Sequence, residues 1–233
     1  FSYQDKYIAG LSIRADGSSR FGPDNRYGYF PAASLGWIMS EESFLKESSV
    51  ISYLKIRASA GVTGNAEIGE NLYNELFLVS NYPNLPGFIP AQLGDPNLKW
   101  EKTTQYDAGL EFGLFNNRLS GEIDIYNKQT RDLLLAVNVP ATNGYFDNIN
   151  NTNQLLQNLG SLENKGVEVL LNGRIIDNGQ FRWNSSFNIA FNKNKIKNIN
   201  GQIIEGGSFF YTRAKEGQPI GVFFMQKFIG VDP

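Results

Sequence analysis

The chain has 233 residues, with 21 lysines and arginines against 23 aspartates and glutamates, and a formal net charge of −2. It contains no histidine and no cysteine. These absences exclude a Ser-His-Asp or Cys-His catalytic system, a histidine-ligated metal, a thiolate zinc site and a disulfide framework. We therefore expect no metal site and no cofactor, and the charge balance argues against a nucleic-acid partner.

The composition indicates a folded chain that is poor in charge. Charged residues make up 19% of the sequence and aromatic residues 13%. Average soluble domains carry about 25% charged residues, and disordered chains have few aromatics. No apolar run approaches the roughly 20 residues that a membrane helix needs. No composition shift marks a domain boundary, so we expect one domain over residues 1–233.

Apolar and polar residues alternate with a period of two through most of the chain, as in strands with one apolar and one polar face. The clearest segment is Leu54–Thr63, where aliphatic residues alternate with lysine, arginine, serine, glycine and threonine. The last expected strand is apolar without clear alternation. In chain order, the expected strands are Tyr7–Arg14, Gly28–Met39, Leu54–Thr63, Gln105–Phe112, Leu119–Ile125, Val167–Ile175, Phe181–Asn192 and Gly221–Val231.

The connections between these strands alternate between long and short. Consecutive antiparallel strands place successive connections at opposite ends of a sheet, so we expect all long loops at one end and all short turns at the other. One short connection, Ser40–Val50, also reads as a short helix capped by Ser40. The long connections are Ala15–Tyr27, Gly64–Leu98, Thr130–Leu159 and Asn194–Pro219; the short ones are Ser40–Val50, Leu114–Arg118 and Ile176–Gln180.

Strand length and loop asymmetry together favour a membrane barrel over a soluble sandwich. The expected strands exceed the typical 5–6 residues of globular strands, and most reach or approach the 9–11 that a transmembrane β-strand needs. The predicted fold is all-β, with antiparallel up-and-down strands forming part of a large transmembrane β-barrel. On the clearest strand, Leu54, Ile56, Ala58 and Ala60 are then expected to face lipid, and Lys55, Arg57 and Ser59 the lumen.

Polar residues on the strands are candidates either for catalysis or for lining the lumen. Glu122 and Asp124 lie two residues apart on one strand face, and paired carboxylates can serve glycoside hydrolysis. We favour a polar lumen stripe, because the carboxylates are dispersed along solvated strand faces, and we expect no catalytic residue. The predicted lumen-facing residues are Arg14, Lys55, Arg57, Glu101, Asp107, Glu111, Glu122, Asp124 and Glu168.

Aromatic residues divide between strands and loops. Trp37, Trp100, Trp183 and Tyr106 lie in or near strands, and we favour interfacial girdle or packing roles for them over sugar stacking. Aromatics in the long loops are better placed to contact a substrate, although packing within the loops is equally compatible with their positions. The candidates for substrate contact are Phe88, Tyr145, Phe146 and Tyr211.

Several segments, in order along most of the chain, resemble the SusC/RagA-type TonB-dependent outer-membrane transporters of Bacteroidota. They are Arg14–Gly22 (RADGSSRFG), Gly28–Trp37 (GYFPAASLGW), Leu54–Asn65 (LKIRASAGVTGN), Asn97–Gln105 (NLKWEKTTQ), Gly160–Glu168 (GSLENKGVE) and Gly217–Gly221 (GQPIG).

This resemblance implies a barrel of about 22 strands filled by a plug. It also implies a SusD-like surface lipoprotein as partner, contact with outer-membrane lipid, and TonB-driven import of oligosaccharides or peptides. About eight strands are expected in this chain, so we interpret residues 1–233 as one partial barrel domain, without the plug and the terminal strands. A secreted all-β carbohydrate-binding module and a barrel enzyme are the alternatives.

Overall fold

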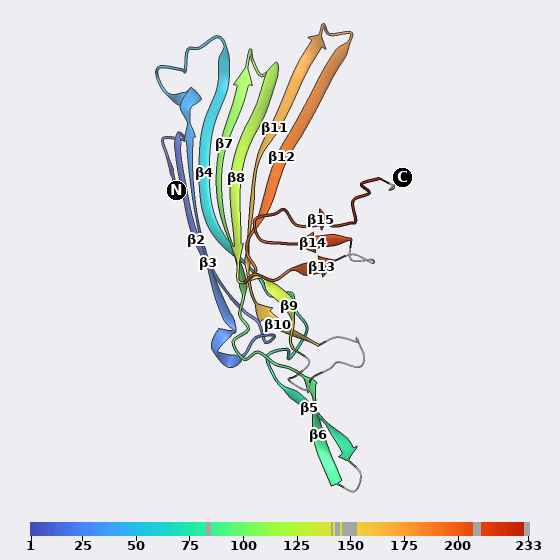
Figure 1. Ribbon diagram of the computed structural model, residues 1–233. Helices are drawn as coiled ribbons and strands as arrows, with labels where there is room; N and C mark the ends of the chain where they lie inside the picture. Colours follow the sequence, from blue (N-terminus) through green and yellow to red (C-terminus); the bar gives the residue numbers. More distant parts are fainter. Residues whose placement is uncertain (83–84, 141, 143–144, 146–152, 207–210, 231–233) are drawn as a thin grey trace.

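The computed structural model describes residues 1–82, 85–140, 142, 145, 153–206 and 211–230, and its main feature is one long antiparallel sheet (Figure 1). The strand order in this sheet is β1-β2-β3-β4-β7-β8-β11-β12, so each strand pairs with its neighbour along this order. The strands are β1 (Ser2–Tyr3), β2 (Tyr7–Gly17), β3 (Tyr27–Ile38), β4 (Ile51–Asn65), β7 (Glu101–Leu114), β8 (Leu119–Arg131), β11 (Ser161–Asp177) and β12 (Arg182–Asn198).

Seven of the eight expected strands form this sheet, and the eighth was wrong. The described part of the expected strand Gly221–Val231, residues 221–230, does not extend the sheet: Val222–Phe223 form the short strand β15, which pairs with β14 (Thr212–Ala214) and through it with β13 (Ile204–Gly206). That segment lacks the alternation that selects one face of a large sheet. The eighth strand of the sheet is instead the short β1, which folds back on β2 through Tyr3 and Tyr7.

The register divides the sheet into two chemically different faces, because directly opposite residues share a face. Lys55 lies opposite Glu111, which lies opposite Glu122, and Asp124 lies opposite Glu168. We call this side the polar face and the other the apolar face. All nine polar residues named above lie on the polar face: Arg14, Lys55, Arg57, Glu101, Asp107, Glu111, Glu122, Asp124 and Glu168.

No layer of the described chain covers the apolar face. Leu11 is 88% exposed, Ile13 73% and Leu35 65%, although all three are large aliphatic side chains in the middle of strands. A soluble sandwich would bury such a face against a second sheet. No helix in the described ranges is long and apolar enough to cross a membrane.

The connections lie as the sequence predicts, with the long ones at one end of the sheet and the others at the opposite end (Figure 1). We call these the loop end and the turn end. The connection lengths themselves were partly wrong, since residues 18–26 form a shorter link than residues 39–50. The expected helix at Ser40–Val50 reduces to one 3-10 turn, Met39–Glu41, which Ser40 does not cap.

The tight turns at the turn end follow from their sequence. Phe115, Asn116 and Asn117 all adopt positive φ, a region that asparagine tolerates better than most residues. In the next turn Gly179 has φ +84°, and the Asn178 side chain accepts hydrogen bonds from the amides of Gln180 and Phe181. These two turns join the antiparallel pairs β7–β8 and β11–β12 into hairpins.

The loop end carries small sheets and the main buried cluster. β5 (Leu76–Tyr82) pairs with β6 (Leu85–Gln92), and β9 (Leu134–Asn138) pairs with β10 (Gln154–Asn158). A 3-10 turn, Pro23–Asn25, lies in the first loop. The buried hydrophobic cluster comprises Phe21, Phe30, Leu98 and Trp100.

This cluster fills the space where β3 and β4 separate. Their pairing ends at Ala32 and Gly61, and Phe30 lies beyond that point. A Cβ added to Gly64 would overlap the Phe30 ring and would lie 3.0 Å from Trp100. Glycine is therefore required at position 64 by close approach, and the cluster ties the first loop to the strands.

Candidate functional site

An ion network occupies the centre of the polar face, across the three adjacent strands β4, β7 and β8. Arg57 lies 2.7 Å from Asp124, 3.1 Å from Glu111 and 3.6 Å from Glu122. Lys55 reaches Glu111 at 3.0 Å. Two cations thus face three carboxylates, and the side chains hold one another in place.

The sequence makes room for this network by placing glycine between its members. Gly109 lies opposite both Arg57 and Asp124 in the register. A Cβ at this position would lie 2.8 Å from Arg57 Nε and would overlap Asp124 Oδ1. Without a side chain on β7 at this point, Arg57 can extend across the middle strand to the carboxylates on β8.

The network is unsuited to general acid catalysis. A carboxyl group that keeps a proton near neutral pH needs apolar surroundings or a second carboxylate without a counter-charge. Glu122 and Asp124, the pair considered for glycoside hydrolysis, instead share the Arg57 guanidinium. We therefore interpret these carboxylates as members of a structural charge network.

The remaining predicted polar residues extend the polar face toward both sides. Asp107 accepts hydrogen bonds from Ser59 at 3.3 Å and Gln105 at 2.7 Å. Glu168 lies opposite Asp124 on β11. The structure thus joins the predicted residues into a continuous charged and polar strip.

Two of the predicted polar residues belong to the loop end instead of the central network. Arg14 pairs with Asp16 at 2.7 Å and lies over the Phe30 ring. Glu101 accepts a hydrogen bond from the backbone amide of Leu134. Both residues therefore connect the strands to the loop-end structures.

The predicted substrate-contact aromatics do not form one cluster. Phe88 is 75% exposed on the β5–β6 hairpin, Tyr145 is buried, and Tyr211 is exposed beside the β13–β15 sheet. Phe146 lies outside the described residues. The burial of Tyr145 favours the packing alternative for that residue, whereas Phe88 and Tyr211 stay candidates on two separate segments.

Two of the strand aromatics considered above, Trp37 and Trp100, make ring contacts with other aromatic residues. Tyr7 and Trp37 stack on the apolar face near the turn end, and both donate hydrogen bonds to Glu42, at 2.7 and 3.1 Å. Lys6 completes this group, 3.2 Å from Glu42. These three donors hold the pKa of the Glu42 carboxyl below its usual value, with the Tyr7 hydrogen bond as the largest cause. Trp100 has a packing role in the loop-end cluster.

Sequence reasoning missed the Glu42 group, because Glu42 lies in a connection with no alternation. Its only signal was the acidic start of Ser40–Val50, which was interpreted as part of a helix. Metal binding was not expected, and no group of three or more histidine, cysteine, aspartate or glutamate side chains suited to a metal lies within the described ranges.

Comparison with known proteins gives consistent results. Residues 1–220 match the family model described as "TonB dependent receptor-like, beta-barrel". The chain is 40% identical over 236 residues to TonB-dependent receptor P39 of Formosa agariphila, a match that covers 99% of this chain and 22% of that protein. It is 42% identical over 209 residues to TonB-dependent receptor SusC of Bacteroides thetaiotaomicron, covering 86% and 20%.

Solved structures agree with these sequence matches. A structure of the RagAB peptide transporter aligns with a TM-score of 0.85 and 33% identity, over 99% of this chain and 25% of the solved chain. A second RagAB structure, the peptide importer in the "open-open" state, aligns with a TM-score of 0.86. The chain thus spans about a fifth to a quarter of the length of the relatives that it matches.

Proposed function

Because the chain belongs to the SusC/RagA-type TonB-dependent receptors, and forms part of their β-barrel, we propose that the whole receptor imports nutrients through the outer membrane. The substrates are oligosaccharides or peptides, the partner is a SusD-like surface lipoprotein, and the TonB system supplies the energy through parts of the receptor outside this chain. The likeness to RagAB, which is described as a peptide transporter, supports peptides as the substrate class. The likeness to SusC supports a TonB-dependent receptor of the same type.

One observation carries this proposal: the sheet has an uncovered apolar face and a polar face with an ion network. On β11 the apolar face runs from Val167 to Ile175, eight residue steps or about 27 Å at 3.3–3.4 Å per residue. A strand tilt of about 40° reduces this to a height of about 20 Å, and side chains at both ends extend it toward the roughly 25 Å band of outer-membrane barrels.

In this arrangement the apolar face contacts outer-membrane lipid, and the polar face lines the lumen. The nine polar residues then surround the transported substrate or the plug, and the loop end faces the outside of the cell. The alternative of a secreted carbohydrate-binding module gains no support, because a soluble module would not leave Leu11 and Ile13 uncovered. The barrel-enzyme alternative gains none either, because the paired carboxylates both lie beside the Arg57 guanidinium.

The assignment of the two faces is tested by labelling single cysteines. The chain has no native cysteine, so Ala58→Cys and Ser59→Cys, made in a cysteine-free full-length receptor, form a matched pair on opposite faces of β4. We expect a charged, water-soluble maleimide to label position 59 in proteoliposomes, and a lipid-soluble reagent to label position 58. Labelling with the opposite pattern overturns the assignment.

The transport function is tested with the full-length receptor and its lipoprotein partner in cells. Uptake of labelled oligosaccharides and peptides is compared with and without the proton-motive force. Glu122→Gln and Asp124→Asn variants are assayed for both uptake and hydrolysis. Energy-dependent uptake without hydrolysis supports the proposal, whereas hydrolysis by the parent that disappears in these variants contradicts it.

A further inference from the structure

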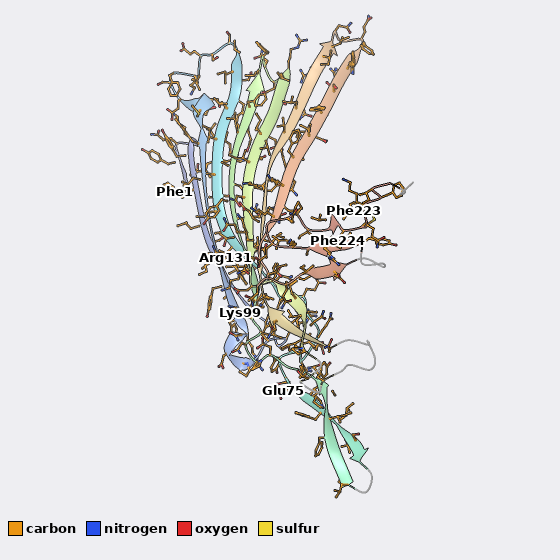
Figure 2. The ribbon with its side chains drawn as sticks, viewed as in Figure 1. Phe1, Glu75, Lys99, Arg131, Phe223 and Phe224 are labelled. Atoms are coloured by element: carbon orange, nitrogen blue, oxygen red, sulfur yellow. The ribbon has the colours of Figure 1, made fainter. Side chains whose placement is uncertain are left out.

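Basic residues gather on the apolar face at its loop end, just beyond the aliphatic band. The register places Lys102 on β7, Arg131 on β8, Lys165 on β11, and Lys193 and Lys195 on β12 on this side. All five are exposed. Figure 2 shows Arg131 at the loop end of β8.

Acidic residues do not balance this group. Among the described residues, the carboxylate on the same part of the face is Glu163, which lies directly opposite Lys195, pairs with Lys197 and lies 3.9 Å from Lys165. Lys102, Arg131, Lys193 and Lys195 have no ion pair within the described ranges. At the turn end, by contrast, Asp177 pairs with both Arg174 and Arg182.

The basic residues also lie directly opposite one another across the strands. Lys102 is the cross-strand partner of Arg131, and Lys165 is the partner of Lys193. Like charges in directly opposite positions destabilise a sheet. The sequence repeats this arrangement twice on one face, so an anion placed between the partners would relieve the repulsion in each pair.

An apolar hollow lies next to the Lys102–Arg131 pair. It has a volume of about 520 Å³, and its lining on this face includes Ile13, Ala33, Ala60 and Tyr106. The small alanine side chains open the hollow between the larger residues. It also includes Thr104, which is two residues, or about 7 Å, from Lys102 on the same face.

We propose that this border is a binding site for an anionic lipid of the external leaflet. Its phosphate group lies between Lys102 and Arg131, and an acyl chain occupies the hollow along Ala33 and Ala60. Lys165 and Lys193 hold a second phosphate in the same layer. A lipid fits better than free phosphate, because the cations border an apolar surface that only an amphiphile can cover. The inference rests on the proposed orientation of the apolar face toward the membrane.

The test measures lipid binding to the full-length receptor, using native mass spectrometry and vesicles. The probes are lipid A that carries phosphate, the same lipid without phosphate, and inorganic phosphate. The test variant is Lys102→Gln/Arg131→Gln. The control is Lys128→Gln/Lys46→Gln, which removes the same total charge from positions outside the proposed site. Lys128 lies on the polar face near the loop end of β8, and Lys46 lies in the connection of residues 39–50 at the turn end. A second variant, Lys165→Gln/Lys193→Gln, does not alter the hollow.

One basic residue near an anionic membrane surface contributes about a five-fold change in affinity. We therefore expect the Lys102/Arg131 variant to bind phosphorylated lipid A about 25-fold more weakly, and the control to match the parent. Equal binding of the lipids with and without phosphate overturns the proposal, as does an unchanged affinity in both test variants. Competition by inorganic phosphate alone, at equal concentration, shows an anion site without a lipid and also contradicts it.

Folding is checked for each variant by the shift of the unheated receptor on gel electrophoresis, so that loss of binding is separated from loss of structure. The lipid test also stands apart from the transport test. A receptor that binds the lipid but imports neither substrate contradicts the proposed function alone. A receptor that imports its substrate but binds lipid A equally well with and without phosphate contradicts this inference alone.

Discussion

Ala58→Arg is the sharpest test of the membrane-facing side of the sheet. Ala58 is the middle residue of the apolar series on β4, with Leu54 four residues to one side and Val62 four residues to the other. Four steps are about 13 Å along the strand, or about 10 Å of depth after tilt. In the proposed orientation, position 58 therefore lies near the middle of the hydrocarbon layer.

An arginine on the lipid face of a barrel at the bilayer midplane costs about 2–4 kcal/mol, falling to about 0–1 near the interfaces. Ala58 lies opposite Leu35 on β3 and Ala108 on β7, so the new guanidinium finds no carboxylate on its own face there. Its long side chain recovers part of the cost by extending toward the headgroups. We therefore expect the free energy of unfolding to fall by about 2–3 kcal/mol.

Ser59→Arg is the matched control, one residue away on the polar face. Ser59 already donates a hydrogen bond to Asp107, so an arginine there gains a carboxylate partner in a hydrated strip. We expect a change of about 0–1 kcal/mol. The assay is reversible urea unfolding of the full-length receptor in lipid vesicles, followed by tryptophan fluorescence. Equal losses in both variants, or a larger loss for Ser59→Arg, would refute the assignment of the faces.

Three further predictions follow from packing and charge. Arg57→Ala removes the cation beside Glu122 and Asp124 and leaves Glu111 paired with Lys55. We expect a loss of about 1–3 kcal/mol in the same unfolding assay, with smaller losses in Arg57→Lys. In Gly64→Ala the new Cβ overlaps the Phe30 ring, and we expect the free energy of unfolding to fall by about 1–3 kcal/mol. Gly36→Ala is the control, because its Cβ would meet only ordinary contacts of 3.5 Å or more. We expect its free energy of unfolding to change little. Because the folded-state pKa of Glu42 is lowered, its contribution to stability is complete above its ordinary pKa of 4.5 and is lost as the pH falls below that value. In Glu42→Gln, the urea concentration at the midpoint of unfolding should therefore depend less on pH over this acidic range than in the parent. An unchanged pH profile would contradict the role of the three donors.

The parts of the fold that could be predicted are those that alternation determines. A one-residue slip would exchange the faces of a whole strand, so the series from Leu54 to Val62 predicts both the face of Lys55 and that of Arg57. The polar face and seven strands follow from this rule, and the two ends of the sheet follow from the antiparallel order of consecutive strands. The strand at Gly221–Val231 was wrong because an apolar run without alternation does not specify which sheet it joins.

The contacts within the site could be predicted only in part. Alternation places Arg57, Glu111 and Asp124 on one side, but the ion pairs depend on the register between strands. That register depends on turns and bulges, such as the one between Ile51 and Tyr53. The position of Trp100 could likewise not be predicted from alternation. The sequence places it near a strand, but β3 and β4 separate at this point and Trp100 is buried beside Phe30.

On both faces of the sheet, the choice of side chains is set by requirements other than substrate binding. The apolar face must satisfy lipid, which distinguishes poorly between leucine, isoleucine and valine, and the polar face uses its charges on one another around Arg57. Selectivity for a glycan or a peptide must then arise where neither constraint applies. In this chain that region is the loop end, where the β5–β6 hairpin presents Phe88 and the β13–β15 sheet adjoins Tyr211. Exchanging these two segments between receptors should therefore transfer substrate preference, while leaving the stability of the strands unchanged.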